Sequence, residues 1–430
     1  MRYIEQERLA VMSGLTIDLN AAYRERGTRF RVYPQAPVLR SVTVPETVWV
    51  SPSPGSIGPG PADRQMYVVD ALGKREPYEA PYLPPYEGQI HRPALPDEAG
   101  HFDHLLPGTR EFEAAHMYAV IRRVLDVWEA YTGRAVRWHF ESLFERLELI
   151  PCIEWDNAQS GFGFIESGYR NNTQGDVQLF CLNFDVLAHE IGHSIVYSEV
   201  GWPVPATETS QYFGFQESAA DMTALIAVLH FDSVVDRLLS DTRGNLYVLN
   251  ELNRIAELSE IEQIRVASND RRMSHYASGW EKEHHLSQPL TGALFDILVE
   301  VFHEILLEDG LIDEGLAAAA YESVLPEREP ERLQGHFDRA FAGRREEFRR
   351  ALLEARDYVG TLLGLVWERL SPHHLTYADV GHAALDADLS LSGGRYRDGI
   401  FECFHWREIG SVLPGPRLSS DFGNGARSCR

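Results

Sequence analysis

Cysteine is scarce in this chain. The 430 residues include only four cysteines, at positions 152, 181, 403 and 429, and none of them forms a C-x-x-C pair. A disulfide-rich scaffold is therefore excluded, and a zinc site built from cysteines is not supported. Cys152 and Cys181 lie in two apolar, strand-like runs, so they could be neighbours in the fold. We expect buried free thiols, with a single disulfide between these two as the alternative.

Long apolar runs are also missing. No stretch of about 18 apolar residues occurs, so no segment is predicted to span a membrane. The first residues, MRYIEQERLAVMSGLTIDLN, are interrupted by charges and lack the apolar stretch of about 7–15 residues of a secretory signal. The compartment stays open between the cytoplasm and export by a route without a recognisable signal.

Basic residues are too few to balance the acidic ones. Lys and Arg number 40 and Asp and Glu number 64, which gives a formal net charge of −24. This balance argues against nucleic acid as a partner. The many carboxylates also permit calcium binding, although the chain contains no D-x-[DN]-x-[DN]-G loop that would support it. The oligomeric state cannot be derived from these numbers.

Three regions follow one another along the chain. Residues 1–105 are rich in proline and poor in helix signals, and we interpret them as an N-terminal extension with some β structure, including a strand at 42–50. This extension either blocks the candidate site described below or braces the neighbouring lobe. Residues 106–200 combine a helix that ends at Gly133 with strand-like runs at 147–155 and 177–182. The pattern there predicts an α/β lobe.

The rest of the chain, residues 201–430, is mainly helical. Apolar residues recur at helical spacing in segments near 215–230 and 288–308 and in pieces of 331–370. Strands with one helix come first and many helices follow, an order typical of an α+β fold. We therefore predict a mixed β-sheet lobe followed by a helical lobe.

The segment 185–198, DVLAHEIGHSIVYS, carries the strongest chemical signal. Asp185 precedes an apolar-periodic run and is expected to cap a helix that begins there. His189 and His193 are then one turn apart on one face, where two imidazoles can bind one zinc ion. Glu190 lies beside them and can reach a water molecule at the metal. The largely apolar flanks predict a buried helix, which disfavours two ordinary surface histidines.

A zinc site needs a third protein ligand. The segment 214–226, GFQESAADMTALI, is a second apolar helical pattern with Glu217 and Asp221 at i and i+4. Two carboxylates on one buried face need partners, since unpaired buried charges are costly. Glu217 as a zinc ligand and Asp221 on the far ring nitrogen of a ligating histidine would satisfy both. A capping or salt-bridge role for the pair is the alternative.

These motifs resemble those of gluzincin zinc metallopeptidases, in particular the thermolysin-like family, of which the chain looks like a divergent member. The resemblance extends over residues 113–300 and includes HEIGH, ESAAD, AAHMY at 114–118, the Asn157-Ala158 pair, RRMS at 271–274 and HHLSQPLTGALFD at 284–296. It implies a two-lobed zincin peptidase fold with the active-site helix between the lobes. It also implies one catalytic Zn²⁺ and a peptide or protein substrate.

The resemblance also suggests further site residues. One of the paired histidines should act in catalysis, and His284 is preferred over His285 because Ser287 follows it at the family's spacing. Asn157 and Ala158 would align the substrate backbone on an edge strand. Arg271 would hold a substrate carbonyl or brace the site. The phenol of Tyr212 is a weaker candidate, because its spacing from the metal-binding glutamate does not match the family.

The predicted function is a zinc-dependent endopeptidase with Glu190 as general base. A metal-dependent aminopeptidase is one alternative, although the chain lacks a G-x-M-E-N motif. A non-catalytic peptide-binding protein that retains the fold is another, and a zinc hydrolase of non-peptide amides is a third. The sequence does not reveal the side-chain preference or the natural substrate.

Overall fold

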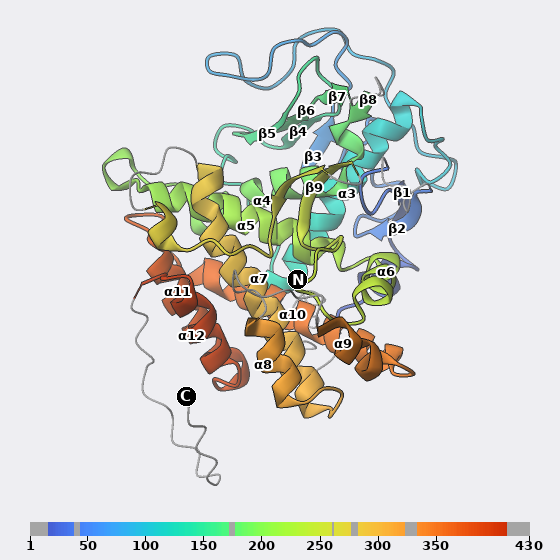
Figure 1. The fold of residues 1–430 in the computed structure, drawn as a ribbon. Coiled ribbons are helices and arrows are strands. Elements are labelled where there is room, and N and C mark those ends of the chain that lie inside the picture. Colours follow the sequence, from blue (N-terminus) through green and yellow to red (C-terminus); the bar gives the residue numbers. More distant parts are fainter. Residues whose placement is uncertain are drawn as a thin grey trace.

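The chain folds into strands and a long helix first and into helices thereafter (Figure 1). The computed structural model describes residues 16–37, 44–171, 177–259, 262–276, 283–322 and 333–410. The class is α+β with a helical C-terminal part, as predicted from the order of the sequence patterns. Figure 1 shows the strands at the top, two helices across the middle and the later helices below.

The largest sheet has four strands in the order β3-β4-β6-β5. Parallel pairs join β3 (Met66–Val68) to β4 (Leu147–Ile150) and β4 to β6 (Phe164–Ser167). β5 (Ala158–Gly161) pairs antiparallel with β6 and forms one edge. The first hundred residues therefore supply the strand at the opposite edge of this sheet.

Three antiparallel ribbons complete the β structure. They are β1 with β2 (Thr28–Val32, Glu46–Val50), β7 with β8 (Tyr169–Asn171, Val177–Leu179), and β9 with β10 (Arg254–Ser259, Glu262–Val266). The predicted strand at 147–155 ends at Ile150, because Pro151 has no N–H to donate to a sheet. The strand predicted at 177–182 ends at Leu179, and a 3₁₀ turn follows it.

Helices make up most of the remaining structure. In the described residues they are α2 Leu19–Tyr23, α3 Arg110–Thr132, α4 Phe184–Val200, α5 Ser210–Val228, α6 Asp232–Thr242, α7 Glu283–Glu308, α8 Glu314–Glu322, α9 Gln334–Phe341, α10 Arg345–Arg369, α11 Tyr377–Ser392 and α12 Arg397–Trp406. The predicted helices at 185–198, 215–230 and 288–308 correspond to α4, α5 and α7, and all three begin earlier than expected.

The start of α4 differs from the prediction in one residue that matters. Asn183 is the N-cap, and its Oδ1 accepts a hydrogen bond from Val186 N at 3.3 Å. The prediction of Asp185 as the cap was wrong, because the helix begins at Phe184 and Asp185 lies in its first turn. A negative charge there still faces the positive end of the helix dipole.

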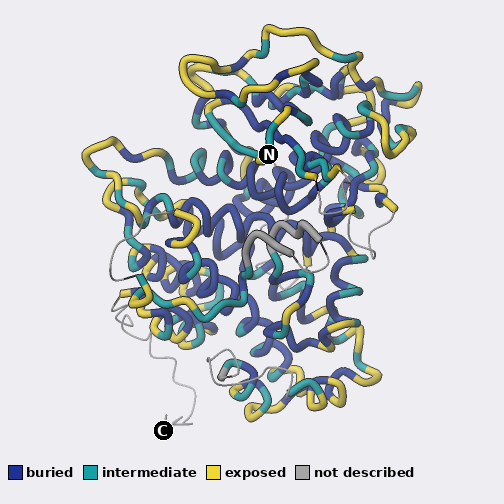
Figure 2. The backbone as a smooth tube through the Cα atoms, turned by 45° about the horizontal axis from the view of Figure 1, so that its top comes forward, coloured by how far each residue is buried: buried dark blue, intermediate teal, exposed yellow. Residues whose placement is uncertain are grey.

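The core lies where α3, α4, α5, α7 and α10 pack together. Figure 2 shows the helices in the middle of the molecule as mostly buried. Trp128 on α3 stacks on Trp367 on α10 with ring centroids 4.3 Å apart. Cys152, Cys181 and Cys403 are free thiols, so the alternative of a disulfide between the first two does not hold. Within the described residues, no helix has the length and apolar character needed to cross a bilayer.

The outer face of the main sheet carries two fully buried glutamates. Glu166 on β6 forms an ion pair with Lys74, Oε2 to Nζ, at 2.6 Å. Glu148 on β4 accepts a hydrogen bond from the Tyr78 hydroxyl at 2.6 Å. Gln159 on β5 donates from Nε2 to Glu166 at 2.7 Å and to the Tyr78 carbonyl at 3.0 Å. The chain around residues 74–78 is thereby fastened to three of the four strands.

Candidate metal centre

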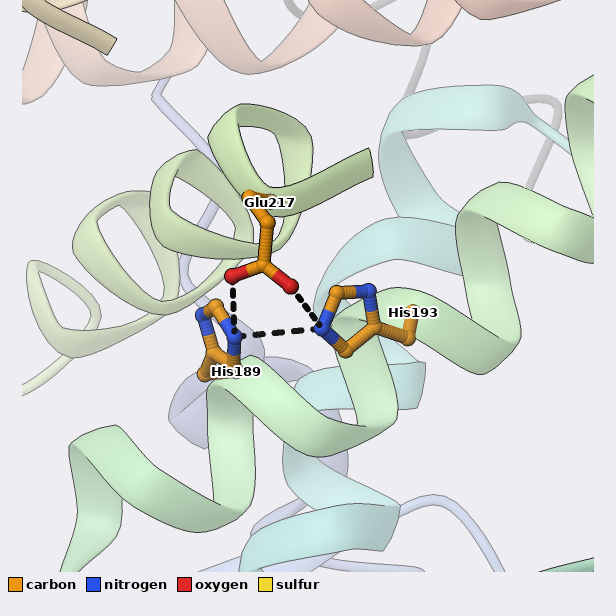
Figure 3. Close-up of side chains that lie close together, drawn as sticks. All are labelled: His189, His193 and Glu217. Carbon is orange, nitrogen blue, oxygen red and sulfur yellow. Dashed lines mark hydrogen bonds and ion pairs between the residues drawn. The ribbon is translucent and has the colours of Figure 1, made fainter. Parts of the chain in front are cut away.

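Two histidines and a glutamate bring their donor atoms together between α4 and α5 (Figure 3). The Nε2 atoms of His189 and His193 lie 3.1 Å apart. Each also lies 3.5 Å from a different oxygen of Glu217, Oε2 for His189 and Oε1 for His193. All three side chains are largely buried, and their donor atoms converge on one point.

This arrangement fits a metal ion. A tetrahedral zinc ion binds such ligands at about 2.0–2.2 Å, which places neighbouring donors about 3.3–3.6 Å apart. The observed separations of 3.1–3.5 Å are close to that range. Two imidazoles and one carboxylate are also a donor set used by catalytic zinc sites. The cluster of His189, His193 and Glu217 could therefore hold a metal ion.

The electrostatics of Glu217 suit a ligand. Burial alone would raise its pKa, but His193, His189 and His284 surround it with imidazole nitrogens that favour the charged form. The pKa of this carboxyl consequently lies well below its usual range. Glu217 is thus a carboxylate at neutral pH, as metal binding requires.

A close helix crossing positions the glutamate against the two histidines. Gly192 of α4 faces α5, where a Cβ at this position would lie 2.9 Å from Ala220 Cα and 3.0 Å from Thr223 Cβ. Only a residue without a side chain allows the helices to approach this closely. The glycine in the HEIGH motif therefore sets the distance between the helix of the histidines and the helix of Glu217.

Asp221 fixes the orientation of one histidine. Its Oδ1 lies 3.0 Å from His189 Nδ1, and its Oδ2 accepts a hydrogen bond from Thr291 Oγ1 at 3.4 Å. A carboxylate at Nδ1 holds the proton there and leaves Nε2 free as the donor to a metal. The structure thus brings Asp221 to the far ring nitrogen of a clustered histidine, the contact suggested for Asp221 from the sequence.

Replacing Asp221 by asparagine should weaken zinc binding about 10–100-fold. The amide keeps the size of the side chain but removes the negative charge that supports the Nδ1–H of His189. Competition against a calibrated zinc chelator would measure the change. Asp386→Asn, on the exposed face of α11, controls for the loss of one negative charge. Equal zinc affinity in wild type and Asp221→Asn would contradict the role given to Asp221.

Glu190 lies on α4 beside the donors but is not one of them. Its side chain is largely buried. The pKa of Tyr197 is raised mainly by burial, and the negative charges of Glu217 and Glu190 add to this shift. Glu190 therefore lies, like Glu217, close enough to Tyr197 to raise the pKa of its phenol, and it is not one of the three clustered side chains.

His284 is the member of the histidine pair that reaches the centre. It lies in the first turn of α7, is half exposed, and places Nδ1 2.7 Å from Glu217 Oε2. Ser287 lies inside α7 and donates a hydrogen bond to the His284 carbonyl at 2.9 Å. The same turn also exposes His285.

The edge strand β5 lies along α4, the helix that carries His189 and His193 (Figure 1). Ser160 Oγ of β5 is 2.9 Å from the Oγ of Ser194, the residue that follows the second histidine on α4. Ala158 opens this strand and Asn157 precedes it with an exposed side chain. The predicted Asn-Ala pair is therefore at the edge of the sheet, on the strand that packs against α4.

Two other candidates are placed away from the donors. Arg271 is exposed, its Nε lies 3.9 Å from Asp270, and among the described residues it makes no recorded contact with the centre. Its carbonyl oxygen accepts a hydrogen bond from the fully buried Arg407 at 3.0 Å. Tyr212 is buried and donates its hydroxyl proton to the Gly201 carbonyl at 2.6 Å, so it is not available to a substrate.

The sequence analysis did not identify the residues that hold the loop around Asn269 and Arg271. Arg407 at the end of α12 binds Asp296 of α7 at 2.7 Å and the Asn269 carbonyl at 2.7 Å. Burial raises the pKa of Asp296 to about 6 even with Arg407 beside it. No local signal identifies this contact, because its partners are more than a hundred residues apart along the chain.

Comparison with solved structures gives matches, whereas comparison of sequences gives none. No protein family and no curated protein sequence matches this chain. Among solved structures, the precursor of protealysin, a metalloproteinase from Serratia proteamaculans, is similar with a TM-score of 0.35 and 12% sequence identity. The match covers 64% of this chain and 86% of that chain. At this level the likeness carries no conclusion about function.

Proposed function

We propose that the protein is a zinc-dependent endopeptidase of the thermolysin-like gluzincin type. The observation that carries the proposal is the convergence of His189, His193 and Glu217 with the second carboxylate of Glu190 beside them. Three protein ligands leave a fourth position open on zinc, as in catalytic rather than structural sites. When bound, the ion supplies Lewis-acid activation of water and of the substrate carbonyl.

The residues of the chain then have separate tasks. Glu190 accepts the proton of the attacking water and delivers it to the leaving nitrogen. His284 donates a hydrogen bond to the oxygen on which negative charge develops. The backbone of Asn157 and Ala158 pairs with an extended peptide added at the edge of the sheet. For Arg271, a bracing role is favoured over substrate contact, since Arg407 holds its carbonyl.

The proposed cleft lies between two parts of the chain. Residues 106–200 supply the edge strand and the two histidines, and residues 201–430 supply Glu217 and His284. We keep residues 1–105 as a separate extension in sequence. In this proposal zinc would bind at the base of the cleft, and a peptide or protein would be the partner.

Removing the metal should abolish peptide cleavage reversibly. The purified chain should contain one zinc ion and cleave internal bonds in a peptide mixture, with products identified by mass. Dialysis against a chelator should stop cleavage, and one equivalent of zinc should restore it, because the proposed reaction needs the ion as a Lewis acid. Circular dichroism controls for unfolding of the metal-free chain. Cleavage that continues without zinc would contradict the proposal.

Peptides with acetylated N-termini separate the alternatives. An endopeptidase cleaves them, whereas an aminopeptidase requires a free amino group and should cleave only the unblocked forms. A protein that binds zinc and peptides but releases no product from either set would be a binding protein. The absence of a G-x-M-E-N motif favours cleavage of the blocked peptides.

A further inference from the structure

A row of aromatic rings continues from the metal centre along α4. Tyr197 follows His193 by four residues, as His193 follows His189, so all three side chains lie on one face of the helix. The Tyr197 ring stacks on His193 with centroids 6.2 Å apart and planes at 24°. Trp202, just beyond the end of α4, lies 4.7 Å from Tyr197. The row thus leads from a metal donor to the surface.

The edge strand leads to the same place. Phe162 follows β5 directly, and its ring lies 5.9 Å from Trp202 and 5.0 Å from His139. The ring of His139 is in turn 5.4 Å from Tyr197. Each of these four residues contacts two of the others through its ring, and we call them the aromatic patch: His139, Phe162, Tyr197 and Trp202.

The aromatic patch is open to solvent and carries no charge at neutral pH. Phe162 is 39% exposed and Trp202 is 42% exposed. Burial lowers the pKa of His139 to about 4, so its imidazole is neutral there. Single exposed apolar residues are common, but adjacent ones that adjoin a candidate site mark a binding surface. Aromatic rings prefer edge-to-face or offset contacts with another ring.

The position of the aromatic patch determines which part of a bound peptide can contact it. A peptide added to the free edge of β5 runs past Ala158 toward Gly161, and Phe162 lies at the end of that path. Ser160 joins the strand to α4 next to the second histidine, and the Tyr197 ring of the patch stacks on that histidine. Side chains alternate along an extended peptide, and one of them reaches the patch from this edge.

We propose that the aromatic patch binds an aromatic or large apolar side chain of the peptide substrate, a few residues from the bond that is cleaved. This inference rests on the proposed function, because it assigns a specificity to the same site. It adds a substrate class: peptides whose backbone extends along β5 and whose side chain on that side is a ring or a large aliphatic group.

The test compares peptides that differ at one position. In blocked peptides with a common cleavage site, Phe or Ser is placed at one position flanking the bond at a time. Wild type should prefer Phe about tenfold in kcat/KM at one position on one side of the bond. Trp202→Ala should lose this preference by slowing only the Phe peptide, and Trp202→Phe should retain it.

Controls separate a local effect from a general one. Leu389→Ala removes a similarly exposed apolar side chain on α11, 38% exposed, and should cleave like wild type. Zinc content should be unchanged in all variants, since none alters a donor. A Phe preference that survives both Trp202→Ala and Phe162→Ala would overturn the inference, as would the absence of any preference in wild type.

A binding measurement keeps this test independent of turnover. The zinc-loaded Glu190→Gln protein is titrated calorimetrically with the same peptides, with and without Trp202→Ala. Tighter binding of the Phe peptide that depends on Trp202 supports the patch even if wild type cleaves nothing, in which case only the proposed endopeptidase function fails. Equal binding of the Phe and Ser peptides overturns the patch whether or not cleavage occurs.

Discussion

Glu190→Gln should lower kcat/KM for peptide cleavage by about 10²–10⁴-fold and leave the zinc content at that of wild type. Glutamine has the shape of glutamate but cannot accept a proton from water. The three donor atoms come from His189, His193 and Glu217, so the substitution leaves the metal ligands in place. A blocked fluorogenic peptide gives the rate, and elemental mass spectrometry gives the zinc content.

Two outcomes would contradict this assignment. Loss of zinc in Glu190→Gln would show that the residue acts as a ligand or is required to assemble the ligands. A rate equal to that of wild type would show that another group removes the proton. Glu346→Gln, in the exposed first turn of α10, is the control for the loss of one negative charge. It should match wild type in both measurements.

Gly192→Ala should reduce zinc affinity at least about tenfold and lower the free energy of unfolding by about 1–3 kcal/mol. The new Cβ would lie 2.9 Å from the backbone Cα of Ala220, which cannot turn away as a flexible side chain can. Relief of the clash moves α5, and Glu217 with it, away from the histidines. Chelator competition and urea denaturation measure the two effects.

The matched control is a helical glycine with room beside it. A Cβ at Gly364 of α10 would meet Thr132 Cγ2 at 3.5 Å, an ordinary contact. Gly364→Ala should keep zinc affinity and slightly raise stability, since alanine favours helices. Equal zinc affinity of Gly192→Ala and wild type would contradict the claim that this crossing positions the site.

The parts of the site that lie within one helix were predictable from the sequence. The i, i+4 spacings of His189 with His193 and of Glu217 with Asp221 place each pair on one face. The need of buried polar groups for partners then indicates that the two helices meet. The structure brings these four side chains together with distances of 3.0–3.5 Å.

Features that depend on distant contacts were not predictable in the same way. Nothing in the pattern of α4 shows that its glycine faces α5, or that Arg407 reaches a loop from the far end of the chain. The sequence of the edge strand, AQSG, has no apolar alternation, and all four residues are only partly buried. Only the resemblance indicated this strand. Asn183 and Asp185 are both good caps by type, and packing decides between them.

The ion pair and hydrogen bonds of residues 74–78 make this early part of the chain a support for the main sheet and its edge strand β5. Cutting away that region would strip Glu166 of Lys74, and breaking a buried ion pair costs about 3–5 kcal/mol. It would also remove β3 from the sheet and the Tyr78 carbonyl, to which Gln159 of the edge strand donates a hydrogen bond. Removal of this segment is therefore expected to disturb the edge strand to which the proposed function assigns peptide binding.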